Sequence, residues 1–107
     1  MKRGDIVSVV TQGDYGKPRP AVIVQNDAIQ KLESVVVCLM TSDLKDAQFR
    51  ITLEPSAETG LQKVSQVMTD KLFTLPKTKI GNIFGRVPAE KMKEIEQGIL
   101  LILGFSN

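Results

Sequence analysis

The sequence predicts a mainly β fold, a small barrel or strongly bent sheet, with one helix packed at its C-terminal end. Short apolar and β-branched runs are separated by glycine, proline, asparagine and aspartate, which is typical of strands joined by turns. Hydrophobic residues recur at helical spacing only near the C-terminal end. A chain of 107 residues that is 42% hydrophobic has room for one core, so we expect a single domain over residues 1–107.

The first half of the chain predicts three strands. Residues 6–11 are mostly β-branched, and residues 21–25 form an apolar run after a loop rich in glycine and proline. Residues 35–40 are apolar at nearly every position, which indicates cover on both faces and a place at the centre of the sheet. Between the last two runs, the polar-leaning residues 28–34 predict a turn or a single helical turn.

The second half predicts three further strands. Residues 49–53 and 63–69 alternate between apolar and polar side chains, and the segment that follows residue 69 either continues the strand or turns. Residues 80–87 form the last predicted strand, where Gly81 and Gly85 indicate bulges or bends.

The C-terminal segment predicts the helix. Pro88 suits a first helical position, Glu90 lies at the positive end of the helix dipole, and Gly104 ends the run. Residues 99–103 are apolar all round, so this end needs cover on every side, from the sheet and from a second subunit.

Composition limits the chemistry that the chain can perform. The sequence has no histidine, which removes the commonest general acid and base and most zinc sites. Its one cysteine, Cys38, lies within a predicted central strand and is expected to be a core residue. The net charge is only +2, so nucleic-acid binding must depend on where the cations are placed. No stretch is long enough to cross a membrane and the N-terminus does not resemble a signal peptide, so a cytoplasmic protein is expected.

Two predicted strand ends present candidate functional side chains. Arg19 lies between Pro18 and Pro20, which stiffen the backbone and lower the entropy cost of fixing the guanidinium on a ligand. Alternatively, these prolines only open an edge strand. Thr41 and Ser42 follow the apolar third strand, and a strand end is a rigid place from which to direct a hydroxyl.

Gln66 interrupts an otherwise apolar face of a predicted strand. A buried glutamine usually binds a neighbouring backbone group, but it can also point at a ligand, and both interpretations stay open at this stage.

An ordered set of motifs covers nearly the whole chain: residues 2–7, Arg-Pro with its apolar run at 19–26, Thr-Ser at 41–42, residues 65–69 with Leu-Pro-Lys at 75–77, and the helix that ends at 103–105. In this ordered set the chain resembles the MazF/PemK family of toxins from type II toxin-antitoxin systems. The family implies an SH3-like barrel with a C-terminal helix, a homodimer, and a metal-independent and cofactor-free endoribonuclease that cuts single-stranded RNA at short sequence motifs.

The resemblance also implies roles for individual residues. The family's catalytic arginine corresponds to Arg19 and its catalytic threonine to Thr41, and the products would be a 2′,3′-cyclic phosphate and a 5′-hydroxyl. Arg19 would stabilise charge on the phosphate first and donate a proton second, because a guanidinium keeps its proton at neutral pH. The general base is not identified. Further candidates for RNA contact, from placement, chemistry and family likeness, are Tyr15, Lys17, Pro20, Ser42, Gln66, Lys71, Lys77 and Lys79.

Departures from the family motif leave other functions open. The loop before Arg19 differs from that of many relatives, and Lys63 and Ser65 stand where one branch of the family has a functional arginine and aspartate. The alternatives are a DNA gyrase poison of the CcdB type, which relies on a C-terminal tryptophan that this chain lacks, and an inactive relative that only binds its antitoxin. A cognate antitoxin is expected to lay an acidic and apolar segment across the RNA groove.

Overall fold

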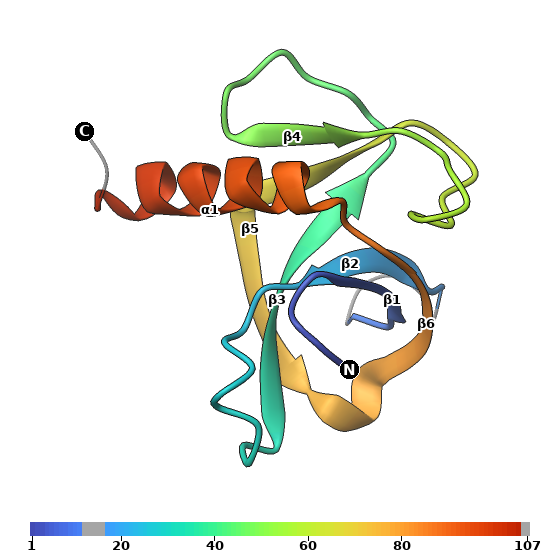
Figure 1. Ribbon diagram of the computed structural model, residues 1–107. Helices are drawn as coiled ribbons and strands as arrows, with labels where there is room; N and C mark the ends of the chain where they lie inside the picture. The colour runs from blue at the N-terminus through green and yellow to red at the C-terminus, as the bar shows by residue number, and fades with distance from the viewer. Residues whose placement is uncertain (12–16, 106–107) are drawn as a thin grey trace.

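The structure is a computed structural model that describes residues 1–11 and 17–105. Six strands and one α-helix follow the order that the sequence predicts (Figure 1). In chain order the elements are β1 (Asp5–Val9), β2 (Arg19–Ile23), β3 (Ser34–Thr41), β4 (Arg50–Leu53), β5 (Ser65–Pro76), the short 3-10 helix η1 (Lys77–Lys79), β6 (Ile80–Arg86) and α1 (Ala89–Leu103).

The six strands form one antiparallel sheet in the order β4-β5-β3-β2-β1-β6. The sheet is strongly bent, as expected, but within the described residues β4 and β6 are its edges and do not pair with each other, so the barrel is not closed (Figure 1). The predicted small bent β fold with a C-terminal helix is therefore confirmed, in an open form. β2 is not an edge strand, because it pairs with both β1 and β3.

Apolar side chains fill both faces of the sheet. One cluster joins Ile6, Val22 and Met40 to Ile95 of the helix, while the other joins Val7, Ala21 and Val37 on the opposite face. Because β3 contributes to both clusters, the expectation of a central strand covered on both sides is confirmed.

The structure settles several strand and helix boundaries. β5 runs without a break from Ser65 to Pro76, which is the continuation that the sequence left open, since the residues after 69 keep pairing with β3. Pro88 is the N-cap and not the first helical residue, because its ψ of 146° is extended. The bulges expected near Gly81 and Gly85 are confirmed by two register shifts between β1 and β6.

The helix lies against β4 and β5 and extends past the sheet at its C-terminal end (Figure 1). Its only fully buried residues are Ile95 and Gly98, and a Cβ on Gly98 would lie 2.8 Å from the Thr69 hydroxyl, so the glycine allows close packing. Gly104 ends the helix in the left-handed region with φ of 81°. Residues 100–103 are 37–52% exposed in this single chain.

An ion pair fixes the N-terminal turn to the last strand. Asp5, almost fully buried, accepts a hydrogen bond from the backbone N–H of Lys2 and pairs with Arg86 at 2.6 Å. The Arg-Gly-Asp motif therefore builds the start of the sheet, with Gly4 at a φ of 94° in the turn. Among the described residues, no helix is both long enough and apolar enough to span a membrane.

Candidate active site

A cavity of about 620 Å³ opens where β2 begins and β3 ends. Its described lining comes from five strands and three loops, which lie far apart in the sequence. The described lining residues are Ser8, Pro18, Arg19, Pro20, Met40, Thr41, Ser42, Gly60, Leu61, Gln62, Lys63, Ser65 and Phe84.

The two predicted catalytic residues lie at this cavity together. Ala21 pairs with Leu39, and continuing this antiparallel register by two residues places Arg19 opposite Thr41. The Nη2 group of Arg19 donates to the carbonyl oxygen of Met40, the residue before Thr41, at 3.4 Å. A contact of this length is a weak hydrogen bond, which a phosphate oxygen can readily replace.

The Thr41 hydroxyl has a defined acceptor role in the turn that follows β3. Its Oγ1 accepts a hydrogen bond from the backbone N–H of Asp43 at 3.0 Å. Because this bond uses a lone pair of the oxygen, the hydroxyl proton can be donated to a ligand in the cavity. The strand end thus presents a hydroxyl whose position is fixed by its own backbone.

The opposite wall is the loop between β4 and β5, which lies on β6. A Cβ on Gly60 would be 2.1 Å from the Phe84 carbonyl oxygen, and a Cβ on Gly85 would be 1.8 Å from the Thr59 carbonyl oxygen. The N–H of Arg86 donates to the carbonyl of Glu58 at 2.8 Å. Only glycine allows these two backbones to approach so closely, so both glycines are needed to hold this wall in place.

The sequence did not indicate that several other residues line the cavity, namely Ser8, Gln62, Lys63, Ser65 and Phe84. They come together only through the contact between the β4–β5 loop and β6, which no local pattern predicts. The glycines at 60 and 85 were the available signal, because they mark a close approach of two backbones.

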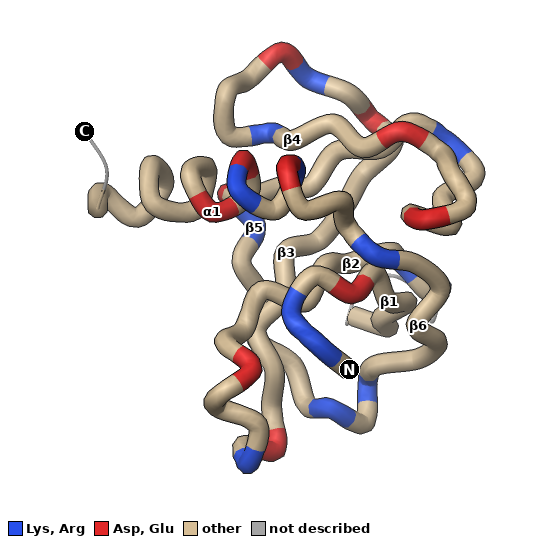
Figure 2. The backbone as a smooth tube through the Cα atoms, in the orientation of Figure 1, with Lys and Arg blue, Asp and Glu red and all other residues tan. Residues whose placement is uncertain are grey.

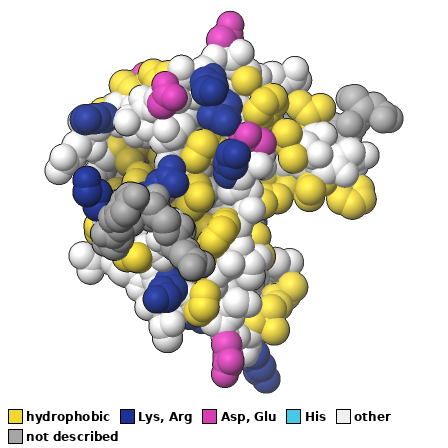
Figure 3. Space-filling model, turned by 180° about the vertical axis from the view of Figure 1, so that it is seen from behind, with side chains coloured by type: hydrophobic (Ala, Val, Ile, Leu, Met, Phe, Trp, Pro, Cys, Tyr) yellow, Lys and Arg dark blue, Asp and Glu magenta, His cyan; other side chains and the backbone are white. Residues whose placement is uncertain are grey.

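The charge of the cavity is favourable for an anion. Arg19 and Lys63 are the charged side chains among the described lining residues, and no carboxylate is among them. Figure 3 shows basic side chains spread over the rear face of the molecule with hydrophobic side chains between them. Such a surface attracts a polyanion without a large net charge on the whole protein.

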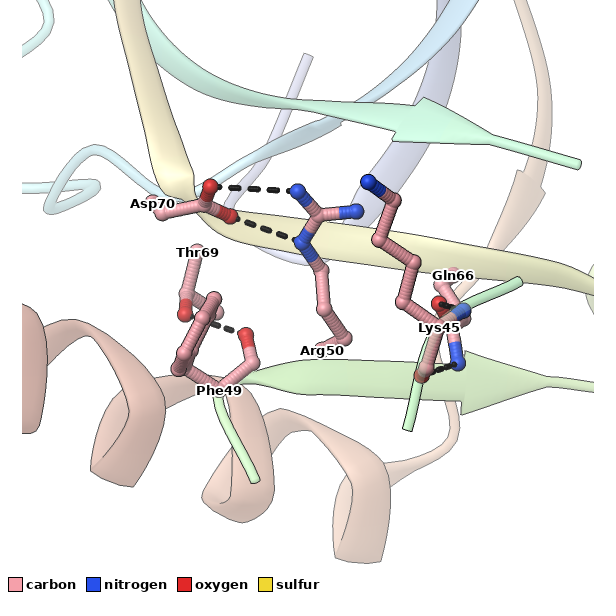
Figure 4. Close-up of polar contacts among 6 residues, drawn as sticks. All are labelled: Lys45, Phe49, Arg50, Gln66, Thr69 and Asp70. Carbon is pink, nitrogen blue, oxygen red and sulfur yellow. Dashed lines mark hydrogen bonds and ion pairs between the residues drawn. The ribbon is translucent and has the colours of Figure 1, made fainter. Parts of the chain in front are cut away.

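Gln66 binds the backbone next to the cavity. Its amide accepts from the N–H of Lys45 and donates to the carbonyl of Lys45, both at 2.9 Å (Figure 4). The same amide also donates to the Thr52 hydroxyl at 3.2 Å. Gln66 pairs with Thr41 in the sheet and is only 5% exposed. The backbone-capping interpretation of Gln66 is thus the contact observed, and it anchors the loop that follows Thr41.

An ion pair lies beside this glutamine on β4 and β5. Arg50 donates to both carboxylate oxygens of Asp70, at 2.8 and 3.1 Å (Figure 4). These hydrogen bonds hold the pKa of Asp70 below its ordinary value of 3.8.

Cys38 is fully buried, and its burial, with a smaller contribution from the charge of Asp70, raises the pKa of the thiol to about 12. The expectation that Cys38 is a core residue is confirmed.

The other predicted RNA contacts are dispersed. Pro20 and Ser42 line the cavity, whereas Lys17 and Lys71 are exposed outside it. Tyr15 lies outside the described residues.

Two further lysines lie on the η1 turn, between β5 and β6 (Figure 2). Pro76, next to this turn, pairs with Ser34 at the opposite end of β3 from Thr41, and the Lys77 ammonium donates to the Gln30 carbonyl at 2.6 Å. Within one chain, Lys77 and Lys79 therefore do not line the cavity that holds Arg19.

The bent sheet and its C-terminal helix define a fold class that the chain shares with solved structures. A solved structure described as an endoribonuclease in complex with its cognate antitoxin from Mycobacterial species superposes with a TM-score of 0.87, at 24% identity over 100% of this chain and 98% of that one. At this identity the likeness shows the fold.

Sequence comparison then identifies the family. The model of the PemK-like, MazF-like toxins of type II toxin-antitoxin systems matches residues 2–103, and the chain belongs to this family. The probable endoribonuclease MazF of Mycolicibacterium smegmatis is 39% identical over the full length of both chains. The endoribonuclease MazF of Staphylococcus saprophyticus is 30% identical over 98% of this chain and 92% of its own.

Proposed function

We propose that this toxin cleaves single-stranded RNA in the cavity between β2 and β3, using the 2′-hydroxyl of the RNA itself as the nucleophile. The enzyme class follows from the family and from relatives named endoribonucleases, so the chain is an endoribonuclease. The observation that supports this chemistry best is the meeting of Arg19 and Thr41 at one cavity whose described lining includes no carboxylate.

The RNA supplies most of the covalent chemistry. The 2′-oxygen attacks the neighbouring phosphorus, a new P–O2′ bond forms, and the P–O5′ bond breaks. The 2′-hydroxyl loses its proton to solvent and the departing 5′-oxygen gains one, which gives a 2′,3′-cyclic phosphate and a 5′-hydroxyl. The protein needs only to position the strand and stabilise charge on the phosphoryl oxygens.

The two strand-end residues suit this task. The guanidinium of Arg19 can offer two parallel N–H donors to the non-bridging phosphate oxygens. The Thr41 hydroxyl, held by the Asp43 N–H, can donate a further hydrogen bond to the same group. Arg19 therefore acts first as an electrostatic stabiliser and second as a proton donor to the leaving oxygen.

The proposal is tested with purified protein, a long single-stranded RNA and EDTA. We expect cleavage at a short recurring sequence, 2′,3′-cyclic phosphate ends, and loss of both with Arg19→Ala. Cleavage that requires an added divalent metal would contradict metal independence. Intact RNA together with inhibited DNA gyrase would favour a gyrase poison, and intact RNA with retained antitoxin binding would favour an inactive relative.

A homodimer would cover the exposed end of the helix. Leu100, Leu101, Ile102 and Leu103 leave a continuous apolar surface, with Phe105 78% exposed beyond it. A patch of this kind on a small protein is more typical of an interface than of a free surface. We expect Leu103→Glu to shift the protein to monomers in light scattering, and an unchanged dimer would place the interface elsewhere.

A cognate antitoxin is the second proposed partner, since one structural neighbour is a toxin in complex with its cognate antitoxin. An acidic and apolar antitoxin segment would occupy the RNA site and compete with RNA in the cytoplasm. Simultaneous binding of antitoxin and RNA at separate sites would contradict competition.

A further inference from the structure

Phe84 of β6 is the aromatic side chain among the described lining residues of the cavity. It is 38% exposed, although phenylalanine is usually buried. Arg19 and Thr41 line the same cavity, so an aromatic residue lies in one cavity with residues whose side chains are suited to bind a phosphate.

The position of Phe84 is set by its backbone. Ile6 pairs with Gly85 and Val7 pairs with Ile83, so Phe84 is the extra residue of a β-bulge and is left out of the ladder. Bulges commonly redirect a side chain near a functional site.

The loop between β4 and β5 lies against the ring. Gly60, with φ of 66°, lies so close that a Cβ there would be 3.3 Å from Cδ2 of Phe84. The backbone of the same loop is bound to Arg86 through the carbonyl of Glu58. Phe84 is thus held between a bulge and a docked loop, which limits its freedom before any ligand binds.

We propose that the ring of Phe84 is a stacking platform for a nucleobase of the RNA strand whose phosphate lies at Arg19. This inference rests on the proposed function and adds a base-binding subsite to it. Every nucleobase has an apolar π-face, and aromatic rings in single-strand binding proteins stack on such faces. The platform therefore raises affinity for RNA and leaves the choice of base to the polar residues beside it.

Polar side chains for that choice are present on the same wall. Gln62 lies on the loop next to Gly60, and Ser8 lies on β1 beside β6. Amide and hydroxyl groups can both donate to and accept from base edges, whereas the ring of Phe84 cannot. On this proposal Phe84 contributes to the affinity for RNA, whereas Gln62 and Ser8 determine which base is bound.

Phe73 of β5 provides a matched control. It is the same residue type, it is 41% exposed, and it does not line the cavity. Phe84→Leu and Phe73→Leu each remove an aromatic ring of similar exposure, but only the first removes it from the cavity. We expect Phe84→Leu to raise KM for RNA by about tenfold to a hundredfold with kcat nearly unchanged, because stacking contributes to binding. Phe73→Leu should leave KM within about twofold, and Phe84→Trp should preserve it.

The measurement uses a short RNA that carries the cleavage sequence mapped in the long RNA, and a copy with a 2′-O-methyl group at the cleaved nucleotide for equilibrium binding. Thermal unfolding checks that each variant is folded. Unchanged KM and unchanged binding in folded Phe84→Leu would overturn the stacking platform while leaving the nuclease intact. Equal loss in Phe73→Leu would also overturn it. Failure of the wild-type protein to cleave would instead overturn the proposed function.

Discussion

Two polar regions lie next to each other in this fold, and they treat their polar groups differently. In the cluster on β4 and β5, Arg50 is bound to Asp70 and Gln66 is bound to Lys45 (Figure 4). Gln66 is also bound to Thr52. At the cavity, Arg19 contacts a backbone carbonyl at 3.4 Å and lines an open volume of about 620 Å³. The polar groups of the cluster bind one another within the protein, whereas Arg19 and Thr41 line an open cavity.

The difference separates a structural arginine from the arginine that we propose to be functional. Arg50 has a side chain that is only 9% exposed and a bidentate carboxylate partner, so its charge is used to hold β4 against β5. Arg19, in contrast, stands at the start of β2 beside a strand-end threonine. Substitutions in the two regions should therefore give opposite results in assays of activity and stability.

Arg19→Ala should give the largest effect of all. We expect RNA cleavage to fall by about 100-fold to 1000-fold, the usual cost of removing a preorganised donor from a developing oxyanion. The free energy of unfolding should change little, because the hydrogen bond from the side chain to the Met40 carbonyl is long and weak. Single-turnover cleavage and urea unfolding measure the two quantities. A folded Arg19→Ala variant with near-normal cleavage would remove the basis of the proposed site.

Asp70→Asn should show the opposite pattern. Breaking the bidentate pair leaves the largely buried Arg50 without its carboxylate, and we expect a loss of about 3 kcal/mol in the free energy of unfolding at pH 7. Cleavage by the folded fraction should be unchanged, since Asp70 does not line the cavity.

The same variant gives a pH test. The pKa of Asp70 is lowered in the folded state, so its stabilisation is present above the ordinary pKa of 3.8 and is lost as pH falls through the lower folded value. The stability difference between wild type and Asp70→Asn should therefore shrink as pH is lowered below about 4. A difference that stays constant down to pH 2 would contradict the ion pair as its source.

Thr41→Val should have an intermediate effect on activity. It removes one hydrogen bond to the phosphate and keeps the shape of the side chain, so we expect cleavage to fall by about 10-fold to 100-fold. Thr74→Val, an exposed threonine of β5, is the matched control and should cleave normally. Equal activity of the two variants would mean that the Thr41 hydroxyl does not contact the reacting phosphate.

Gln66→Met should give the smallest effect. It removes the bonds to Lys45, but Lys45 is exposed and water can replace them, so we expect a loss of about 1 kcal/mol in stability. Amide hydrogen exchange at Lys45 should rise in this variant. Unchanged exchange there would show that the loop is held by other contacts.

Much of the fold could be predicted from local patterns. The apolar run at 35–40 predicted a central strand, and the glycines at 81 and 85 predicted irregular pairing of β6. The sequence left open whether β5 continues past residue 69, because its second half has a different exposure pattern from its first: residues 65–69 are buried, whereas Lys71, Phe73 and Thr74 are exposed. Backbone pairing with β3, a long-range contact, decides that boundary.

From the sequence, only the wall of the cavity that carries Arg19 and Thr41 could be predicted. Arg19 and Thr41 stand at strand ends that the sequence marks with prolines and hydroxyls, so their position could be inferred. The other wall depends on a loop that lies on β6 through two glycines, and sequence periodicity carries no information about such a contact. Lys77 could not be placed either, because the register of β5 determines that it lies at the far end of β3.

The central claim is that Arg19 and Thr41 act on one phosphate, and a double-mutant cycle with Arg19→Lys and Thr41→Val measures this most directly. Single-turnover kcat/KM is determined for the wild type, both single variants and the double variant. If both side chains bind the same phosphoryl group, the losses are not additive, with a coupling free energy above about 0.5 kcal/mol. Strictly additive losses would show that the two residues act independently and would contradict a shared phosphate.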